Sequence, residues 1–301
     1  MTMEPAPDVS QSRMRTFLAV ADTGSVRAAA ASLHVTEPAV STALGQLRRV
    51  LGVDLVRREG RGVRLTAAGE VYAGYCRTIM GLLEQAYAAV QTAEEGRLRL
   101  GAVATASEVV LPPALGAFRR LHPKVELSLV VAPRDQLFDH LRHHEVDLVL
   151  GGRPPHGAGF ALRATRPNTL IVVGAPGVHA DLARTTWLMR SRGSGLRDTT
   201  LGLLNRLELD PPQLTLGTHG AVVASARSGL GITLVHADAV AGDLDRGDLV
   251  QLDVPRTPMA RPWVVATAPV APSTAELFIT HLTDREVMGA SAFHPVNRPA
   301  G

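Results

Sequence analysis

Hydrophobic residues recur at helical spacing through the first fifty residues of the chain. Three short amphipathic helices are therefore predicted, over residues 14–21, 26–33 and 37–51. Ser25 and Thr36 stand directly before the second and third helices, where a hydroxyl can accept a hydrogen bond from a free backbone N–H. Gly52 is suited to end the third helix. The pattern predicts a compact helical unit.

A small hairpin and one long helix are predicted next. Two short extended segments, residues 54–58 and 62–65, flank a turn at residues 59–61. Residues 67–95 then contain no proline and repeat apolar positions at helical spacing, at Val71, Tyr75, Ile79, Leu82, Leu83, Ala86 and Val90. Because this helix is longer than a small domain needs, we expect a linker that pairs with a second copy of itself in a dimer.

Beyond Gly96 apolar strands alternate with helices, which predicts a parallel sheet with helices packed on it. The first cycle comprises residues 98–104, 112–121, 125–131, 136–143 and 146–150. A second cycle comprises residues 169–173, 186–190, 213–217, 221–228, 231–235 and 249–252. A strand at 263–268 and a helix at 273–282 are expected to return to the first lobe. The tail from Ser291 is expected to be mobile.

Composition narrows the class of protein. At 301 residues with 46% hydrophobic content, the chain is long enough for two well-buried domains. A formal charge of +3 permits a polyanionic partner without requiring one. The single cysteine, Cys76, excludes an intramolecular disulfide framework and a metal–thiolate cluster. Because the sequence shows no secretory signal and no bilayer-spanning segment, we expect a cytoplasmic protein.

Residues 14–69 contain a series of short motifs: RTFLAVA at 15–21, GS at 24–25, AAA at 28–30, LHVT at 33–36, PAVS at 38–41, LGV at 51–53 and RLTAAG at 64–69. In the order and spacing of these motifs the segment resembles the LysR-type transcriptional regulators. It extends more weakly to about residue 285. The run RSRGSGLR at 190–197 is similar to the subgroup that regulates carbon fixation and sulphur assimilation.

The resemblance implies an α/β protein overall, with three functional parts. These are a winged helix-turn-helix DNA-binding domain over residues 1–66, a linker or dimerisation helix over 67–95, and an effector-binding domain over 96–290 that is similar to periplasmic binding proteins. Its two α/β lobes would comprise 97–165 with 263–290 and 166–262, followed by a tail over 291–301. The implied function is a sequence-specific transcriptional regulator that is controlled by a small-molecule effector and works as a homodimer or homotetramer.

The start of the third helix carries the predicted base readers. In a helix-turn-helix the second helix of the motif lies in the major groove, with its N-terminal residues facing base edges. The residues so placed are Thr36, Glu37, Pro38, Ser41 and Thr42. Glu37 can only accept hydrogen bonds, which suits a cytosine amino group, although a carboxylate at a helix start is also stabilised by the helix dipole. The family commonly has Gln at this position, so base preference there can differ.

Arginines follow the reading residues. Six arginines against two acids give residues 48–64 an excess of four positive charges. Contact with DNA phosphates is predicted for Arg48, Arg57, Arg58 and Arg61. The alternative is that they are ordinary solvated side chains.

The predicted effector site uses strand ends and helix starts of both lobes. The candidate residues are Thr105, Ser107, Arg134, Arg192, Ser194 and Thr218. Glycines on either side of Ser194 would let backbone N–H groups reach an oxyanion, with a nearby arginine completing the site. We therefore expect a small anionic effector, held between Thr105 of the first lobe and Ser194 with Thr218 of the second. The alternatives are helix capping by Ser107, a plain surface turn at 193–195, and an apolar ligand in place of the anion.

The sequence does not contain the common motifs of catalytic sites. The sequence lacks a G-x-S-x-G elbow, a Walker loop, an H-E-x-x-H motif and a complete G-x-G-x-x-G motif, so neither catalysis nor a cofactor is expected. His140, His143 and His144 have helical spacing, but exposed histidines at a helix end are the preferred interpretation, so no metal site is predicted. The alternative function is a ligand sensor without a transcriptional role. The expected partners are double-stranded DNA and a small-molecule effector, without a membrane.

Overall fold

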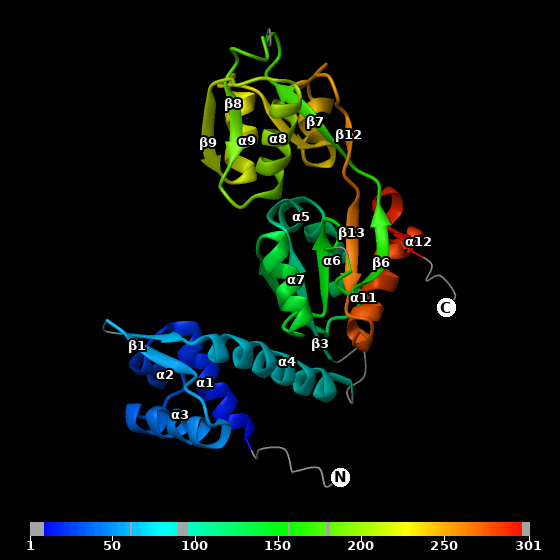
Figure 1. The fold of residues 1–301 in the computed structure, drawn as a ribbon. Coiled ribbons are helices and arrows are strands. Elements are labelled where there is room, and N and C mark those ends of the chain that lie inside the picture. Colours follow the sequence, from blue (N-terminus) through cyan, green and yellow to red (C-terminus); the bar gives the residue numbers. More distant parts are fainter. Residues whose placement is uncertain (1–8, 61, 90–95, 156, 179–180, 297–301) are drawn as a thin grey trace. The chain divides into compact units, whose positions relative to one another are not determined.

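The computed structural model describes residues 9–60, 62–89, 96–155, 157–178 and 181–296. The chain divides into two compact units (Figure 1). The first unit holds the described residues up to 89 together with 142–145, and the second unit holds the remainder.

Within its described residues, the first unit consists of helices and one hairpin. Its elements are α1 (Gln11–Thr23), α2 (Val26–Ser32), α3 (Glu37–Leu51), β1 (Val56–Glu59), β2 (Gly62–Leu65) and α4 (Ala67–Ala89). The Ser25 and Thr36 hydroxyls accept from backbone N–H groups three residues further on, at 3.3 and 3.4 Å. Gly52 ends α3 with φ of +72°, a conformation that glycine adopts without strain. The predicted caps are therefore confirmed.

The core of the first unit joins α1, α3 and α4. Phe17, Leu47 and Cys76 are fully buried in one cluster. Val40 is fully buried in a second cluster, together with alanines of α2. Helix α3 thus turns Val40 and Leu47 inward, which leaves its opposite face outward.

Helix α4 has one buried and one exposed face. Ala73 and Cys76 are buried on the inner face. The outer face carries a row of exposed apolar side chains at helical spacing, namely Val71, Tyr75, Ile79, Leu82, Leu83 and Tyr87. The predicted helix over 67–95 is described as far as Ala89, and residues 90–95, with Val90, lie outside the described residues.

The second unit contains two lobes, and a mixed six-stranded sheet forms the first. Its strand order is β14 (His294–Pro295), β6 (Ala161–Arg166), β13 (Trp263–Thr267), β5 (Leu148–Gly151), β3 (Arg97–Ala102) and β4 (Glu126–Val131). The helices of this lobe are α5 (Ala104–Val109), α6 (Leu111–Leu121), α7 (Arg134–Arg142), α11 (Ser273–Thr283) and α12 (Arg285–Met288), followed by η2 (Gly289–Ser291). Leu100, Phe118, Val265 and Phe278 pack in its main core.

The second lobe combines two small sheets with three helices in its described residues (Figure 1). Its elements are β7 (Thr169–Gly174), β8 (Trp187–Arg190), α8 (Gly195–Arg206), β9 (Gln213–Gly217), α9 (His219–Arg227), β10 (Thr233–His236), η1 (Ala237–Val240), α10 (Ala241–Asp245), β11 (Val250–Leu252) and β12 (Met259–Ala260). Strand β7 pairs antiparallel with β10, β11 and β12, and β8 pairs parallel with β9. Trp187 and Leu203 are fully buried in its core.

Two expectations from the sequence were wrong. The sheet of the first lobe is mixed rather than wholly parallel, because β13 enters it antiparallel to β5 and β6, and β7 of the second lobe pairs antiparallel with each of its partner strands. The tail is not mobile from Ser291, because β14 pairs with β6 and Phe293 is buried. In addition, strand β6 was not predicted.

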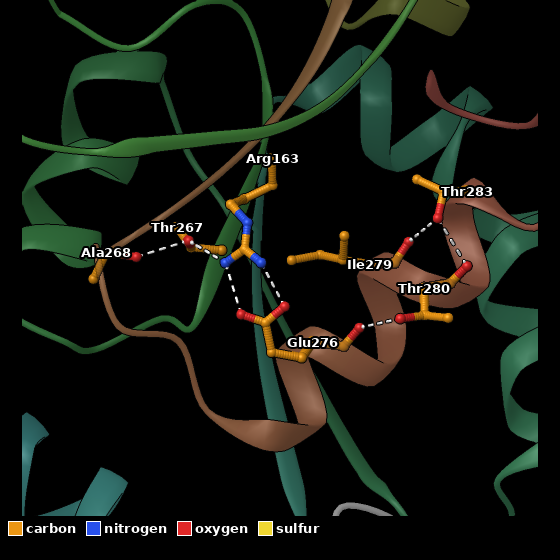
Figure 2. A network of polar contacts seen from close by, with 7 residues as sticks. All are labelled: Arg163, Thr267, Ala268, Glu276, Ile279, Thr280 and Thr283. Carbon is orange, nitrogen blue, oxygen red and sulfur yellow. Dashed lines mark hydrogen bonds and ion pairs between the residues drawn. The ribbon is translucent and has the colours of Figure 1, made fainter. Parts of the chain in front are cut away.

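A network of polar contacts joins β6 to β13 and α11, the strand and helix with which the chain returns to the first lobe (Figure 2). Both guanidinium Nη atoms of Arg163 on β6 donate to the Glu276 carboxylate on α11, at 2.7 and 2.5 Å. Arg163 also donates to the Thr267 hydroxyl on β13 at 3.4 Å. One side chain therefore links β6 to β13 and α11, through partners that lie 104 and 113 residues further along the chain.

Candidate functional site

The outer face of α3 carries the predicted base readers. Glu37, Pro38, Ser41 and Thr42 are all exposed, and their spacing places them on one side of the helix. Thr36 differs, because its hydroxyl accepts from the backbone N–H of Ala39 and serves as the helix cap. The exposed side is thus a short polar surface of hydroxyls and one carboxylate.

The hairpin presents arginines on both of its faces. Arg57 pairs in register with Arg64, whereas Arg58 pairs with Val63 and points to the opposite face. Arg64 Nη1 lies 3.5 Å from a Glu59 carboxylate oxygen, so its charge is partly compensated. Arg57 forms no ion pair among the described residues. The Val63 N–H donates to the Gly24 carbonyl at 2.9 Å and holds the hairpin against the corner between α1 and α2.

Of the other two arginines that were predicted to contact phosphate, Arg48 lies at the end of α3 and Arg61 is not described. Arg48 is exposed at the end of α3, where its Nε lies 3.0 Å from an Asp54 carboxylate oxygen. Its charge is partly compensated by that exposed pair. Arg61 lies outside the described residues.

A cleft in the second unit is lined by both lobes and encloses about 370 Å³. This volume lies within the range of small-molecule sites. Four predicted effector residues line it, namely Thr105, Arg134, Arg192 and Ser194. The structure therefore brings together residues that are separated by up to 89 positions in the sequence.

Arg190 is the most deeply placed cation in this cleft among the described residues. It ends β8, is only 8% exposed, and donates through Nε to the Gly217 carbonyl at 2.9 Å. In the part of the chain that the structure describes, Arg190 forms no ion pair. Burial lowers the pKa of its guanidinium, and the Glu108 carboxylate acts in the opposite direction. A guanidinium stays protonated in proteins, so the cleft holds a buried and unneutralised positive charge.

The N-terminus of α8 faces the same cleft. Ser194 is the N-cap residue, but its hydroxyl makes no capping hydrogen bond. Gly195 begins the helix and also lines the cleft. A free hydroxyl, backbone N–H groups and the positive end of a helix dipole all favour an anion at this position.

Two segments of the chain cross between the lobes, and the second of them contributes Arg261, Pro262 and Trp263 to the lining of the cleft. Asn168 lies on the first crossing and Arg261 on the second, and the Arg261 N–H donates to the Asn168 carbonyl at 2.8 Å. His236 stacks on the Trp263 ring at a centroid distance of 4.3 Å. Burial, followed by the charges of Arg261, His219 and Arg190, lowers the pKa of His236 to about 3, so its ring is neutral at neutral pH.

Two predicted effector residues do not line the cleft. The Ser107 hydroxyl donates to the Ala104 carbonyl at 2.8 Å within α5, and the Thr218 hydroxyl caps α9 by accepting from the Ala221 N–H at 3.2 Å. Helix-local bonds therefore occupy both hydroxyls. Arg197, which flanks the glycine stretch, donates to the Arg190 carbonyl and the Thr215 hydroxyl instead of lining the cleft.

Sequence reasoning missed several residues of the cleft wall. Arg190 was noted only as a neighbour of the glycine stretch, and His236, Arg261 and Trp263 were not singled out. For Arg190, a signal was present, because a charged residue ends the otherwise apolar strand Trp187–Arg190. His236, Arg261 and Trp263 come from segments that are brought together only by the fold, and no local sequence pattern predicts that they lie close in space.

Neither a metal site nor a membrane helix is found among the residues that the structure describes. No group of three or more potential metal ligands occurs among them. No helix in the described ranges is both long and apolar enough to span a membrane.

Comparison with known protein families decides the identity. Residues 12–70 match the model "Bacterial regulatory helix-turn-helix protein, lysR family", and residues 91–286 match the model "LysR substrate binding domain". The chain belongs to the LysR family of transcriptional regulators. It is thus a DNA-binding transcriptional regulator with an effector-binding domain, and it is not an enzyme.

Individual LysR-family relatives agree with this assignment. The chain is 33% identical over 269 residues to the RuBisCO operon transcriptional regulator of Allochromatium vinosum, covering 85% of this chain and 88% of the relative. Full-length CbnR complexed with its target DNA has a TM-score of 0.63 and 22% identity, covering 91% of this chain and 98% of that one. The Synechocystis PCC6803 CcmR regulatory domain in complex with 2-PG has a TM-score of 0.54 and 26% identity, covering 62% and 95%. The carbon-fixation subgroup resembled by the sequence is therefore represented among its relatives.

Proposed function

We propose that this LysR-family regulator reads operator bases with Glu37, Ser41 and Thr42 and holds the DNA backbone with its hairpin. The observation that supports base reading is the exposed polar side of α3, opposite the buried Val40 and Leu47. A helix-turn-helix places such a side toward base edges in the major groove. The exposed Arg57 on the hairpin, which has no ion-pair partner among the described residues, is suited to phosphate.

Footprinting on the DNA that flanks the regulator's own gene tests this role. The full-length protein should protect an inverted repeat, and Ser41→Ala should change the preference at one base position by roughly 1–3 kcal/mol. Ser12→Ala, on the exposed start of α1, is the matched control and should leave base preference unchanged. Equal loss of affinity for every sequence by Ser41→Ala would remove Ser41 from base reading.

The working form is proposed to be a homodimer joined through α4. Six large apolar side chains form the exposed row on that helix, and Tyr75 and Tyr87 are 66% and 73% exposed. A contiguous apolar surface of this kind favours association, and a second copy of the same helix is its proposed occupant. Two recognition helices about 34 Å apart would then meet successive major grooves of an inverted repeat.

Sedimentation of the full-length protein tests the dimer. The wild type should sediment as a dimer or larger at micromolar concentration, and Tyr75→Glu with Ile79→Glu should shift it toward monomer. Glu84→Gln, a polar change on the same helix, is the control. A monomeric wild type at this concentration would contradict the proposal.

The effector is proposed to be a small anion bound in the cleft. The observation that carries this step is Arg190, which is buried, lines the cleft and has no ion-pair partner among the described residues. The uncapped Ser194 at the start of α8 supplies a second anion-binding feature, and Thr105 supplies a hydroxyl from the other lobe. The 2-PG bound by the CcmR regulatory domain gives further support for this chemistry. The cytoplasm is the proposed location, since both chromosomal DNA and such metabolites are found there.

Calorimetry of the full-length protein against small carboxylates and phosphates tests the effector class. Arg190→Gln should abolish binding of every anion that binds the wild type, while Arg206→Gln, an exposed arginine on α8 outside the cleft, should not. Binding of neutral apolar compounds alone would show that the anion proposal is wrong.

A further inference from the structure

The two segments that cross between the lobes join the sheet of the first lobe at neighbouring positions (Figure 1). Arg166 is the last residue of β6, Trp263 is the first residue of β13, and the two residues are direct partners in the antiparallel register. Side chains of directly paired residues lie on the same face of a sheet. Arg166 and Trp263 therefore stand together at the edge where the first lobe gives way to the second.

Asp238 of the second lobe binds both of these residues. It lies in η1, directly after β10. One of its carboxylate oxygens, Oδ2, accepts from the Arg166 guanidinium and also from the Trp263 indole Nε1, the latter at 3.0 Å. The Arg166 side chain is only 12% exposed, so the ion pair is partly shielded from solvent. Because Asp238 belongs to the second lobe and its partners to the first, a rotation of one lobe against the other would strain or break these bonds.

The C-terminal segment holds another side of the Arg166 guanidinium. Nη1 of Arg166 donates to the Ser291 carbonyl at 3.4 Å, and the guanidinium carbon lies 5.5 Å from the centre of the Phe293 ring. A cation above an aromatic face is attracted to it. Phe293 is itself buried, and its N–H donates to the Leu282 carbonyl at 2.8 Å. The segment thus gives the guanidinium a second set of contacts beside the one to Asp238.

We propose that Arg166 is a positioning residue that sets the angle between the two lobes. Its pair with Asp238 favours the lobe arrangement of this structure, and residues 291–293 keep the guanidinium in place for that pair. Neither Arg166 nor Asp238 lines the cleft. The pair therefore acts on the cleft through the arrangement of the lobes, and the inference does not depend on the chemistry of the effector. An effector that binds better at another angle must work against this pair.

Distances between two spin labels on the full-length protein test the inference by pulsed electron paramagnetic resonance. Gln136→Cys on α7 of the first lobe and Asn205→Cys on α8 of the second lobe provide exposed label sites outside the cleft. Cys76 is buried and stays unlabelled. Dilution with unlabelled protein ensures that only the two labels of one chain contribute. With Arg166 and Asp238 intact, one distance should dominate, with other arrangements at or below about 10%.

Asp238→Asn and Arg166→Gln should each raise the minor fraction about threefold or more, which is the size of effect expected from losing an ion pair of this exposure. Arg166→Lys keeps the charge and should give a smaller rise than Arg166→Gln. Phe293→Leu keeps an apolar side chain but removes the ring beside the guanidinium, so it should raise the minor fraction about twofold. Asp245→Asn, a change of an exposed acid on α10, is the matched control and should leave the distances unchanged.

Each outcome bears on one part of the proposal. Unchanged distances in both Asp238→Asn and Arg166→Gln, or several equally populated distances with the pair intact, would overturn the role of Arg166. Unchanged distances in Phe293→Leu alone would overturn the role of the C-terminal segment. Circular dichroism shows whether each variant is folded. If Arg166→Gln does not fold, the near-isosteric Asp238→Asn decides, since it removes the same ion pair from the other side.

Discussion

Arg190 and Thr105 meet across the ligand cleft, where Nη1 of Arg190 lies 3.4 Å from the Thr105 hydroxyl oxygen. Arg190 ends β8 of the second lobe, and Thr105 lies on α5 of the first lobe, with 8% and 6% of their surfaces exposed. A ligand changes a conformational equilibrium only through a difference in its affinity for the two states. A contact that joins the lobes at the proposed anion site is therefore a suitable place for such a difference to arise.

Thr105→Ala should abolish the response to ligand and leave operator affinity within about twofold, because the change removes a hydroxyl from the cleft and leaves the residues of the DNA-binding helices unchanged. Gel-shift titrations of the full-length protein with and without ligand measure both quantities. Thr105→Ser keeps the hydroxyl and should retain the response. A Thr105→Ala variant that still responds fully would exclude the hydroxyl from effector sensing.

Arg57→Ala should weaken binding to all DNA sequences about equally and lower the slope of log affinity against log salt by about one. The physical reason is that one fewer phosphate neutralisation releases about one fewer counterion. Gel shifts between 50 and 200 mM salt, roughly the range over which this effect is large, give the slope. The control is Arg206→Ala, a change on α8, which should leave the slope as in wild type. If Arg57→Ala also has the wild-type slope, Arg57 does not contact a phosphate.

His236 should make the effector-binding unit less stable in mild acid. Its pKa is lowered to about 3, first by burial and then by Arg261, His219 and Arg190, whereas an unfolded histidine titrates near 6.5. Below about pH 6.5 the unfolded chain binds the proton first, so stability falls with pH down to about 3. The slope from this one group is at most about 1.4 kcal/mol per pH unit.

Urea unfolding of wild type and His236→Gln at pH 7.5 and pH 5.0 measures this contribution. The variant is expected to lose stability at pH 7.5, because the stacking on Trp263 is lost. It should nevertheless show a smaller loss between the two pH values than wild type. An identical pH dependence in both proteins would mean that His236 does not contribute.

The Arg163–Glu276 pair should contribute modestly to stability. The pair is bidentate, but the Glu276 side chain is 46% exposed, so solvent screens the attraction. A double-mutant cycle with Arg163→Ala and Glu276→Ala should give a coupling of about 0.5–1 kcal/mol in urea unfolding. A coupling near zero would show that the network in Figure 2 orders the segment without stabilising it.

Local chemistry in the sequence was enough to predict the helices of the first unit and the exposed side of α3. Ser25, Thr36 and Gly52 fix where α2 and α3 begin or end, because caps act on backbone groups within a few residues. Helical periodicity then separates buried Val40 and Leu47 from exposed Ser41 and Thr42. These effects depend on neighbours along the chain, which a single sequence displays directly.

The tertiary structure decided what the sequence alone left open. Strand β6 escaped prediction because Arg163 and Arg166 interrupt its apolar pattern, and their partners, Glu276 and Asp238, lie 113 and 72 residues away. The effector cleft followed the same rule. The hydroxyls of Ser107 and Thr218 make hydrogen bonds within their own helices, whereas Arg190 and Arg261 line the cleft from separate segments of the chain. The burial of charges and the pairing of distant residues depend on which segments are close together in the folded chain, and local patterns in the sequence do not predict this.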